Sequence, residues 1–232
     1  MPVPPWGRPR KSAPRRIFSQ EAVVAAALRV IDTEGVAALS MRRVAQELGT
    51  GAASLYAHVA GREELIGLVL DRVLAEVTCP EPDPERWQEQ IKEMLRQSRR
   101  VLAAHGDLAR LLPEVGVPTG ESATGAAEGM LGILAAGGLP PQACAYALDA
   151  LTLYVTGIVA EEAIRAQESK DPEQAEQTFL ARVHRYYEAL PPERFPMLTG
   201  MMKEMTRDVG DERFEFGLDL MVTGLAAHVP PR

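Results

Sequence analysis

The stretch that decides the fold is residues 39–62, LSMRRVAQELGTGAASLYAHVAGR. Ser40 can cap a short helix by accepting hydrogen bonds from free backbone N–H groups, and Gly49 can end that helix in a left-handed turn. Leu39 and Val44 flank the cap at the spacing of a hydrophobic staple. A second short helix begins within two residues of Gly49. Two short helices joined by a glycine-containing turn form a helix-turn-helix, whose second helix lies in the DNA major groove.

Three motifs in residues 19–78 resemble the DNA-binding domain of the tetracycline-repressor (TetR) family. They are IDTEG at 31–35, LSMRRVAQELG at 39–49 and SLYAHVAGREEL at 54–65. The resemblance implies a scaffold helix capped by Ser19 and ended by Gly35, then the helix-turn-helix, then a long connector helix. It also implies a ligand-responsive transcriptional regulator, most simply a repressor, that binds a palindromic operator as a homodimer.

The outward-facing residues of this stretch are the candidate DNA contacts, because Leu55 and Val59 point back into the domain. Arginine can bind phosphate or base edges, hydroxyl groups can donate to phosphate, and alanine offers only apolar contact, typically with a thymine methyl group. Tyr56 has a second interpretation as a residue of the domain core. The candidate DNA-binding residues are Arg42, Arg43, Ala52, Ala53, Ser54, Tyr56, His58 and Arg62.

Charge is divided unevenly along the chain. Residues 1–16 hold five basic residues and no acid, a local charge of +5. The whole chain has a net charge of −7, so the remaining residues together carry −12. This asymmetry is typical of a protein that meets phosphates at one end. The proline-rich segment 1–16 predicts a disordered basic arm, and its GRPRK sequence either reads a narrow minor groove, as AT-hooks do, or is a solvated tail.

Composition excludes several other classes. The chain has 232 residues, is rich in Ala and Leu, and holds only 5% aromatic residues, which indicates helices. We find no run of eighteen apolar residues and no signal-peptide segment, so we expect a cytoplasmic protein with no membrane partner. Cys79 and Cys144 are too few for a disulfide framework; they are ordinary small residues or a redox-sensing pair.

Helical periodicity continues through the rest of the chain, which predicts an all-α fold in three parts. Residues 1–16 are the basic arm, 17–64 the three-helix helix-turn-helix domain, and 65–232 a helical ligand-binding and dimerisation domain. Further helices are expected over 85–112 and 122–136, from GGLPP at 137–141 to about Gln167, and over 179–190. Arg96, Arg99 and Arg100 are expected to face solvent rather than a ligand.

The last helix, ERFEFGLDLMVTGLAAHV at 212–229, resembles the closing helix of the tetracycline repressor. That resemblance implies a four-helix bundle with the long helix and with both counterparts from a second subunit. Gly217 and Gly224 could allow close approach there, and a charge at Leu218 or Met221 is expected to yield monomers. The alternative is an ordinary internal core helix.

The effector site is expected in the weakly matching middle of the chain. The places of the tetracycline repressor's pocket histidines hold Thr78 and Leu112, so the resemblance implies no metal site and no metal-chelated tetracycline. Glu161 is either a pocket carboxylate or a residue of the dimer surface. By elimination we predict a largely apolar pocket, although its methionines are also ordinary core residues. The candidate ligand-binding residues are Met94, Leu102, Leu111, Leu112, Met130, Tyr154 and Glu161.

Two rival functions remain. An effector-free DNA-binding protein, constitutive or architectural, would have a filled body with no cavity. An all-α enzyme is disfavoured, because the chain has no nucleophile elbow, HExxH, phosphate loop or GxGxxG and its four histidines lie far apart in sequence. We therefore expect no catalytic residues and no cofactor. The sequence leaves open the effector, the operator, the regulated genes and the choice between repression and activation.

Overall fold

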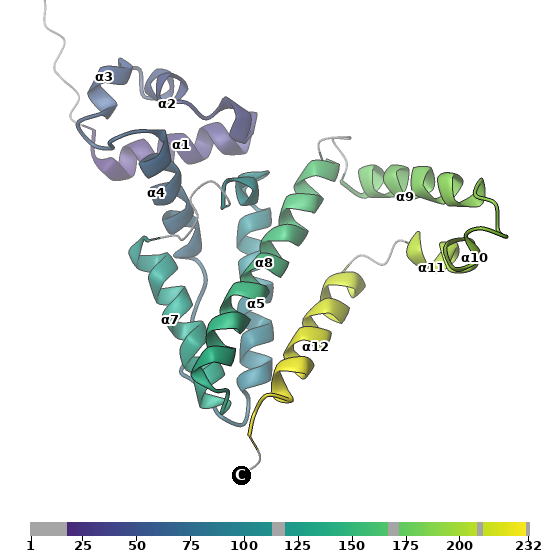
Figure 1. Ribbon diagram of the computed structural model, residues 1–232. Helices are drawn as coiled ribbons and strands as arrows, with labels where there is room; N and C mark the ends of the chain where they lie inside the picture. Colours follow the sequence, from purple (N-terminus) through teal and green to yellow (C-terminus); the bar gives the residue numbers. More distant parts are fainter. Residues whose placement is uncertain (1–17, 113–118, 167–171, 208–210, 231–232) are drawn as a thin grey trace, which may run out of the picture.

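The computed structural model describes residues 18–112, 119–166, 172–207 and 211–230, with the backbone alone for 172–176. These ranges contain helices and no strand, which confirms the all-α prediction. A small head of α1, η1, α2 and α3 stands above a longer helical body, and α4 joins the two (Figure 1). The expected basic arm, residues 1–16, lies outside the described residues.

Helix α1 (Gln20–Glu34) is the scaffold of the head. The Oγ atom of Ser19 accepts a hydrogen bond from the N–H of Ala22 at 3.3 Å, so Ser19 is the cap that the sequence predicts. Gly35 ends the helix with a φ of 81°, a conformation that glycine adopts readily. The short helix η1 (Val36–Ala38) follows. The face of α1 that packs on α2 and α4 buries Val23, Val24, Ala26, Ala27, Val30 and Ile31.

Helices α2 (Met41–Glu47) and α3 (Ala52–Leu55) form the predicted helix-turn-helix. The Oγ atom of Ser40 accepts from the N–H of Arg43 at 3.2 Å, and Gly49 makes the turn with a φ of 66°. Helix α3 is a single turn, shorter than the sequence suggests. Backbone bonds from His58 and Val59 to the carbonyl of Leu55, at 2.8 and 3.0 Å, continue it as turns.

Helix α4 (Arg62–Leu74) runs from the head into the body. Leu65, Val69 and Val73 are fully buried along one side, as the apolar spacing predicts. Near its far end, Asp71 Oδ1 accepts a hydrogen bond from the N–H of Ala123 at 2.9 Å, which fastens α4 to the first turn of α7. The expected domain boundary at 64/65 falls inside α4, so the head and the body share a continuous helix.

The body is built on α5 (Trp87–Ala103), η2 (Leu108–Leu111), α7 (Glu121–Ala136) and α8 (Pro141–Ala166). The proline-rich segment 78–85 separates α4 from α5, and α5, α7 and α8 pack on one another. Burying these apolar side chains is the main stabilising term of the body. The fully buried residues at its centre include Ile91, Met94, Leu95, Leu111, Ile133, Leu134 and Leu151.

Three short to medium helices leave the body together as one projection. Helix α9 (Pro172–Glu188) extends sideways from the head end of α8, and α10 (Pro196–Gly200) and α11 (Met202–Met205) fold back beneath it (Figure 1). Their apolar side chains are largely exposed: Tyr186, Met197, Met201 and Met205 are each about half to two-thirds exposed. We call this unit the α9–α11 projection.

The last helix, α12 (Glu212–Ala226), returns along the body and packs on α5 and α8. Phe214, Leu218 and Val222 are buried in this contact. The ring of Phe214 stacks on Tyr154 of α8 with centroids 5.7 Å apart, and the Tyr154 hydroxyl donates to the carbonyl of Phe214 at 3.0 Å. Leu218 is therefore a core residue of the single chain, which corrects the expectation that it lies between subunits.

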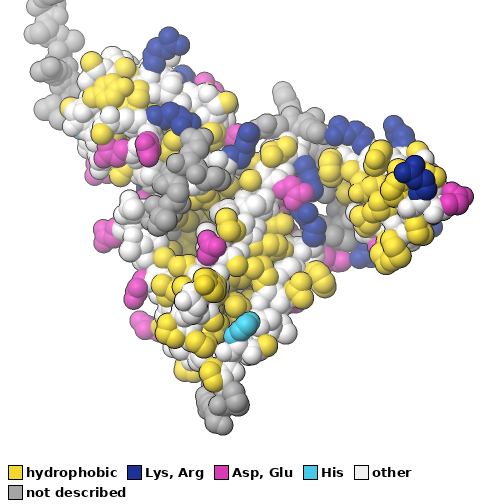
Figure 2. All heavy atoms as spheres, in the orientation of Figure 1, with side chains coloured by type: hydrophobic (Ala, Val, Ile, Leu, Met, Phe, Trp, Pro, Cys, Tyr) yellow, Lys and Arg dark blue, Asp and Glu magenta, His cyan; other side chains and the backbone are white. Residues whose placement is uncertain are grey.

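Helices α8 and α12 leave an apolar face uncovered. Hydrophobic side chains spread over these helices in Figure 2. The largest are Tyr146 and Leu153 on α8 and Phe216 and Leu220 on α12, each more than 60% exposed. By length and composition α8 could also cross a membrane, contrary to our expectation of no such segment. Its packing on α5, α7 and α12 makes it a helix of the body.

Candidate DNA-binding face and effector cavity

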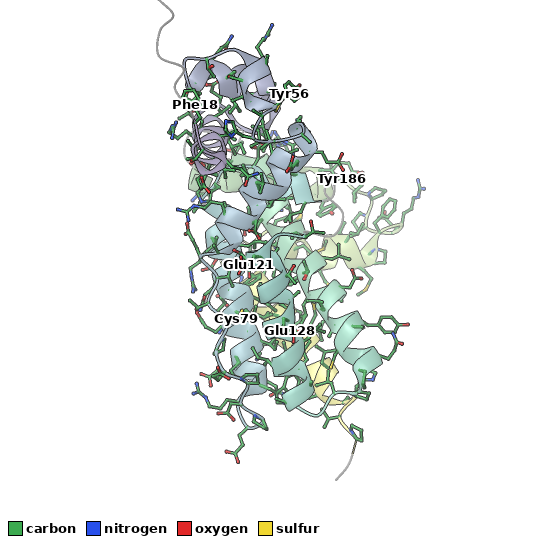
Figure 3. All side chains as sticks on the ribbon, turned by 90° about the vertical axis from the view of Figure 1, so that its left-hand side faces the viewer. Phe18, Tyr56, Cys79, Glu121, Glu128 and Tyr186 are labelled. Atoms are coloured by element: carbon green, nitrogen blue, oxygen red, sulfur yellow. The ribbon has the colours of Figure 1, made fainter. Side chains whose placement is uncertain are left out.

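The outer surface of the head is formed by α3 and the turn that follows it. Leu55 and Val59 are buried beneath it, whereas Ala53, Ser54 and Tyr56 are exposed, as the sequence predicts. The side chain of Tyr56 is 56% exposed and extends outward at the edge of the head (Figure 3), so the alternative of a core tyrosine is wrong. Ala52 and His58 are half-buried at the two ends of this surface.

The hydroxyl groups at the start of α3 are engaged with one another. Ser54 Oγ lies 2.6 Å from the carbonyl oxygen of Gly51, to which it donates, and 2.7 Å from Thr50 Oγ1. Gly51 at the N-cap of α3 has no side chain, and these bonds hold the first turn of the helix without capping its free N–H groups. Ser54 therefore supports the shape of this surface and retains acceptor capacity. A donor role toward phosphate requires the local bond to be exchanged.

The three candidate arginines lie in different environments. Arg42 is exposed on α2. Arg43 bridges two carboxylates within the head, with Nη2 2.5 Å from Glu34 Oε1 and 3.0 Å from Glu47 Oε2. These hydrogen bonds raise its pKa above the ordinary value. Arg62 is half-buried at the start of α4, and its Nε donates to the carbonyl of Leu39 at 3.3 Å.

Arg42 thus has the environment expected of a phosphate or base contact, whereas Arg43 holds α1 and α2 together. The head has no surplus of positive charge. Residues 18–64 hold four arginines, no lysine and six acids, and the positive charge of this end resides in residues 1–16. Net charge therefore attracts DNA to residues 1–16 rather than to the head. The head itself can contribute through the shape and the hydrogen-bonding groups of the α3 surface.

The body contains a cavity of about 1060 Å³ between its upper end and the α9–α11 projection. Six segments contribute to its wall: the end of α1, the end of α5, the turn before η2, the second half of α8, α9, and the segment from α11 to α12. Its volume is at the upper end of the range for small-molecule sites. The apolar part of the wall consists of Ile31, Ala103, Ile158, Val159, Ala163, Ala166, Phe179, Leu180, Val183, Tyr187, Met205 and Phe214.

Most of the predicted pocket residues do not reach this cavity. Glu161 lines it, and Tyr154 supports its wall by stacking on Phe214. The others correct our expectation, because they fill the interior between α5, η2, α7 and α8, where a helical spacing of apolar residues cannot distinguish a core from a cavity. Residues predicted as lining that do not line the cavity are Met94, Leu102, Leu111, Leu112 and Met130.

The cavity wall is also more charged than predicted. Arg99 lies 4.7 Å above the ring of Phe214, and its guanidinium donates to Glu162 Oε1 and Asp211 Oδ1, each at 2.7 Å. Arg99 therefore ties α5 to α8 and to the start of α12. This corrects the expectation of a solvent-facing Arg99 and adds charged groups to a wall that is apolar over most of its area. Arg96 likewise pairs with Glu215 of α12, at 2.6 Å.

A second charged group surrounds Glu161. Glu161 Oε2 accepts from Arg213 at 2.7 Å and Oε1 pairs with Arg165, whose guanidinium lies 4.7 Å above the ring of Phe179. Burial acts to raise the pKa of Glu161, but the hydrogen bond from Arg213 and the two positive charges outweigh it, so the pKa is lowered. The cavity thus presents aromatic rings with guanidinium groups against them, together with carboxylates that pair with those guanidinium groups.

Sequence reasoning missed Phe179, Tyr187, Arg165 and Arg213 as wall residues. Phe179 and Tyr187 lie on α9, Arg165 at the end of α8 and Arg213 at the start of α12, and these segments are far apart in the chain. Only their meeting in space identifies them. Thr78 and Leu112, at the expected places of metal-binding histidines, also stand apart from the cavity, and the Thr78 hydroxyl donates to Gln97 at 2.8 Å.

Family models match both parts of the chain. Residues 23–69 match the bacterial regulatory proteins of the tetR family, and residues 79–229 match the tetracyclin repressor-like C-terminal domain. An HTH-type transcriptional regulator of Saccharopolyspora erythraea is 32% identical over 96% of this chain and 91% of its own length.

Solved structures agree with this similarity. ActR of Streptomyces coelicolor, in a complex with actinorhodin, is 43% identical with a TM-score of 0.83, over 92% of this chain and 98% of that chain. BioQ with its double-stranded DNA operator, from Mycobacterium smegmatis, is 28% identical with a TM-score of 0.65, over 91% of this chain and 99% of that chain.

Proposed function

The chain belongs to the TetR family of bacterial regulatory proteins, and we propose that it is a transcriptional repressor released from a palindromic operator by a large ring-containing effector. The observation that carries this proposal is the combination of an exposed α3 surface with a cavity of about 1060 Å³ in the same chain. The family is one of regulators and not of enzymes. We place its action in the cytoplasm.

We propose that two copies bind one operator. A single helix-turn-helix buries too little surface for a selective site, so two must be held about one helical turn of DNA apart, roughly 34–36 Å. The exposed apolar face of α8 and α12, which includes Phe216 and Leu220, supports a homodimer. Within each head, Arg42, Tyr56 and the short side chains of Ala52 and Ala53 are the proposed DNA contacts, with His58 and Arg62 at the ends of the surface.

The wall of the cavity suggests the chemistry of the effector. Phe179 and Tyr187 of α9 offer half-buried aromatic rings, and Arg165 lies over the ring of Phe179. The ring of Phe214 is buried against Arg99 and Tyr154 and forms a closed part of the wall. Ring faces backed by charge favour a flat, polarisable molecule with polar substituents at its edge. The binding of actinorhodin by ActR, a neighbour at 43% identity, supports a ligand of comparable size. This chemistry replaces the small apolar effector expected from the sequence.

Release requires only that the effector bind one conformation better than the other. A ligand that prefers the released conformation about a hundredfold shifts the equilibrium by about 2.7 kcal/mol per site. Two sites in a dimer are then enough to reverse a moderately favourable operator complex. The rival of an effector-free DNA-binding protein predicts a filled body, and the cavity argues against it.

The test is a genomic selection with the full-length protein followed by titration of the selected duplex. We expect short inverted repeats, nanomolar binding at low salt, and release on addition of actinorhodin as a probe ligand. The matched control is Tyr56→Ala, which keeps the body intact and should bind the selected duplex about tenfold more weakly. Failure to enrich any inverted repeat would overturn the operator proposal. Enrichment without release by actinorhodin or related multi-ring compounds would overturn the effector class alone.

A further inference from the structure

The segment His105-Gly106-Asp107, between α5 and η2, makes one hydrogen bond with the end of α1 and one with the start of η1. Asp107 Oδ1 accepts from the backbone N–H of Val36 at 2.8 Å, and His105 Nδ1 lies 2.9 Å from Asp32 Oδ1. These contacts join the body to the head across about seventy residues of sequence. We call this group the head–body latch.

Asp107 is the part of the latch that is built into the interior. Within the part of the chain that the structure describes, Asp107 is the one buried charged residue, with 7% of its surface exposed. A buried carboxylate is costly unless it is hydrogen-bonded, so the Val36 N–H is a strong constraint on where the head can sit. Gly35 and Gly106, with φ values of 81° and 57°, make the two turns that bring these backbones together.

The latch is also part of the cavity wall. Asp107, Gly106, Asp32 and Gly35 all line the space assigned above to the effector. A molecule that fills this end of the cavity therefore touches the groups that hold the head. The same carboxylate therefore lines the cavity and accepts the hydrogen bond from Val36.

Helix α1 links the latch to the DNA-binding face. Its far end carries Gln20, whose Nε2 donates to the carbonyl of His58 at 3.0 Å, at the end of the α3 surface. At 1.5 Å per residue, the fifteen residues of α1 form a rod of about 22 Å. A small rotation at the latch becomes a displacement at the surface that reads DNA.

We propose that Asp107 is a positioning residue that fixes the orientation of the head on the body and transmits cavity occupancy to it through the Val36 N–H. This inference rests on the proposed function, because it assigns the regulation of the same cavity. It makes the spacing between the two heads of a dimer depend on one buried carboxylate.

The test removes either partner of the bond. Asp107→Ala removes the acceptor, and Val36→Pro removes the donor at the first position of η1, where proline is tolerated. Each change should weaken binding to the selected operator about tenfold and flatten the dependence of affinity on half-site spacing, measured with duplexes one base pair longer and shorter. The double variant should be no weaker than the single ones, since both remove the same interaction.

Two controls separate positioning from stability. Asp107→Asn keeps an oxygen that can accept from Val36 and should restore the spacing preference. Arg110→Ala removes the exposed partner that lies 3.4 Å from Asp107 Oδ2 and should leave the spacing preference unchanged. An unaltered spacing profile in both Asp107→Ala and Val36→Pro, or additive losses in the double variant, would overturn the latch.

Hydrogen exchange keeps the test independent of the operator. Amides of residues 31–38 should exchange faster in Asp107→Ala and in Val36→Pro, with no further gain in the double variant, while amides of α5 keep their wild-type protection. Wild-type protection of residues 31–38 in both single variants would refute the latch. If the wild-type protein selects no duplex, the proposed function fails and this exchange pattern alone decides the latch.

Discussion

The head and the body of this protein place their functional residues in opposite ways. The proposed DNA-binding face comes from one continuous stretch, in which buried Leu55 and Val59 alternate with exposed residues such as Tyr56. The cavity wall comes from six segments that meet only in the folded chain. Local hydrogen bonds therefore determine the first, and packing between distant helices determines the second. Mutations should separate the two regions accordingly.

The largest loss of stability is expected where α12 packs on α5 and α8. Leu218→Asp places a carboxylate at a fully buried position of α12 and should unfold the chain, at a cost of more than about 4 kcal/mol. Circular dichroism and thermal melting measure this loss. The matched change two residues on, Leu220→Asp, lies on the exposed face and should leave a folded monomer that binds operator weakly. A folded Leu218→Asp variant would place Leu218 outside the core.

A smaller loss is expected at the close approach of α12 to α8. A Cβ atom at Gly217 would lie 2.2 Å from the Tyr154 hydroxyl, so Gly217→Ala forces the ring to move. We expect a decrease of about 1–3 kcal/mol in the free energy of unfolding, measured by urea denaturation. Gly224→Ala is the control, since no atom lies within 4 Å of its added Cβ within the chain. Equal effects at both glycines would argue against this contact.

In the head we expect loss of binding without loss of stability. Tyr56→Ala and Arg42→Ala should each weaken operator binding about tenfold, or about 1.4 kcal/mol, because each removes a charge-assisted or polar contact to the duplex. The melting temperature should stay unchanged, since both side chains are exposed. Arg72→Ala, an exposed arginine on the body side of α4, is the control for total charge. Unchanged binding would remove the two residues from the interface.

The smallest effect concerns the charged wall of the cavity. The lowered pKa of Glu161 means that its ion pairs stabilise the folded chain above the unfolded pKa, about 4.3, and that this contribution is lost as the pH falls through the folded value. The side chain is 40% exposed, so we expect under about 1 kcal/mol. The wild-type protein should melt slightly above Glu161→Gln at pH 7, and this difference should shrink as the pH is lowered below about 4.3. A difference independent of pH would contradict the ion-pair role.

The head could be predicted nearly residue by residue, because each signal acts within a turn or two. Ser19 and Ser40 cap their helices because a hydroxyl oxygen can accept from free N–H groups, and Gly35 and Gly49 end them because glycine adopts positive φ readily. What the sequence missed there is a tertiary effect. Arg43, predicted as a DNA contact, is held by Glu34 of another helix, and the length of α3 is limited to one turn.

The body was predictable as helices but not as a site. Apolar spacing located α5, α7, α8 and α12, yet Met94 and Met130 proved to be core residues, and Arg99 proved to line the cavity. Helical periodicity reports that a side chain faces inward. It carries no information about whether another side chain or an empty volume lies opposite.

By itself, the sequence determined the helical class, the position of the helix-turn-helix and the exposed residues of its reading surface, since capping, turn formation and amphipathic spacing all act over a few residues. Only the tertiary structure decided which carboxylates face which arginines, where the cavity opens, and that Asp107 of the body holds Val36 of the head. The reason is physical: burial and electrostatic pairing depend on distances between segments, and those distances exist only after the helices have packed.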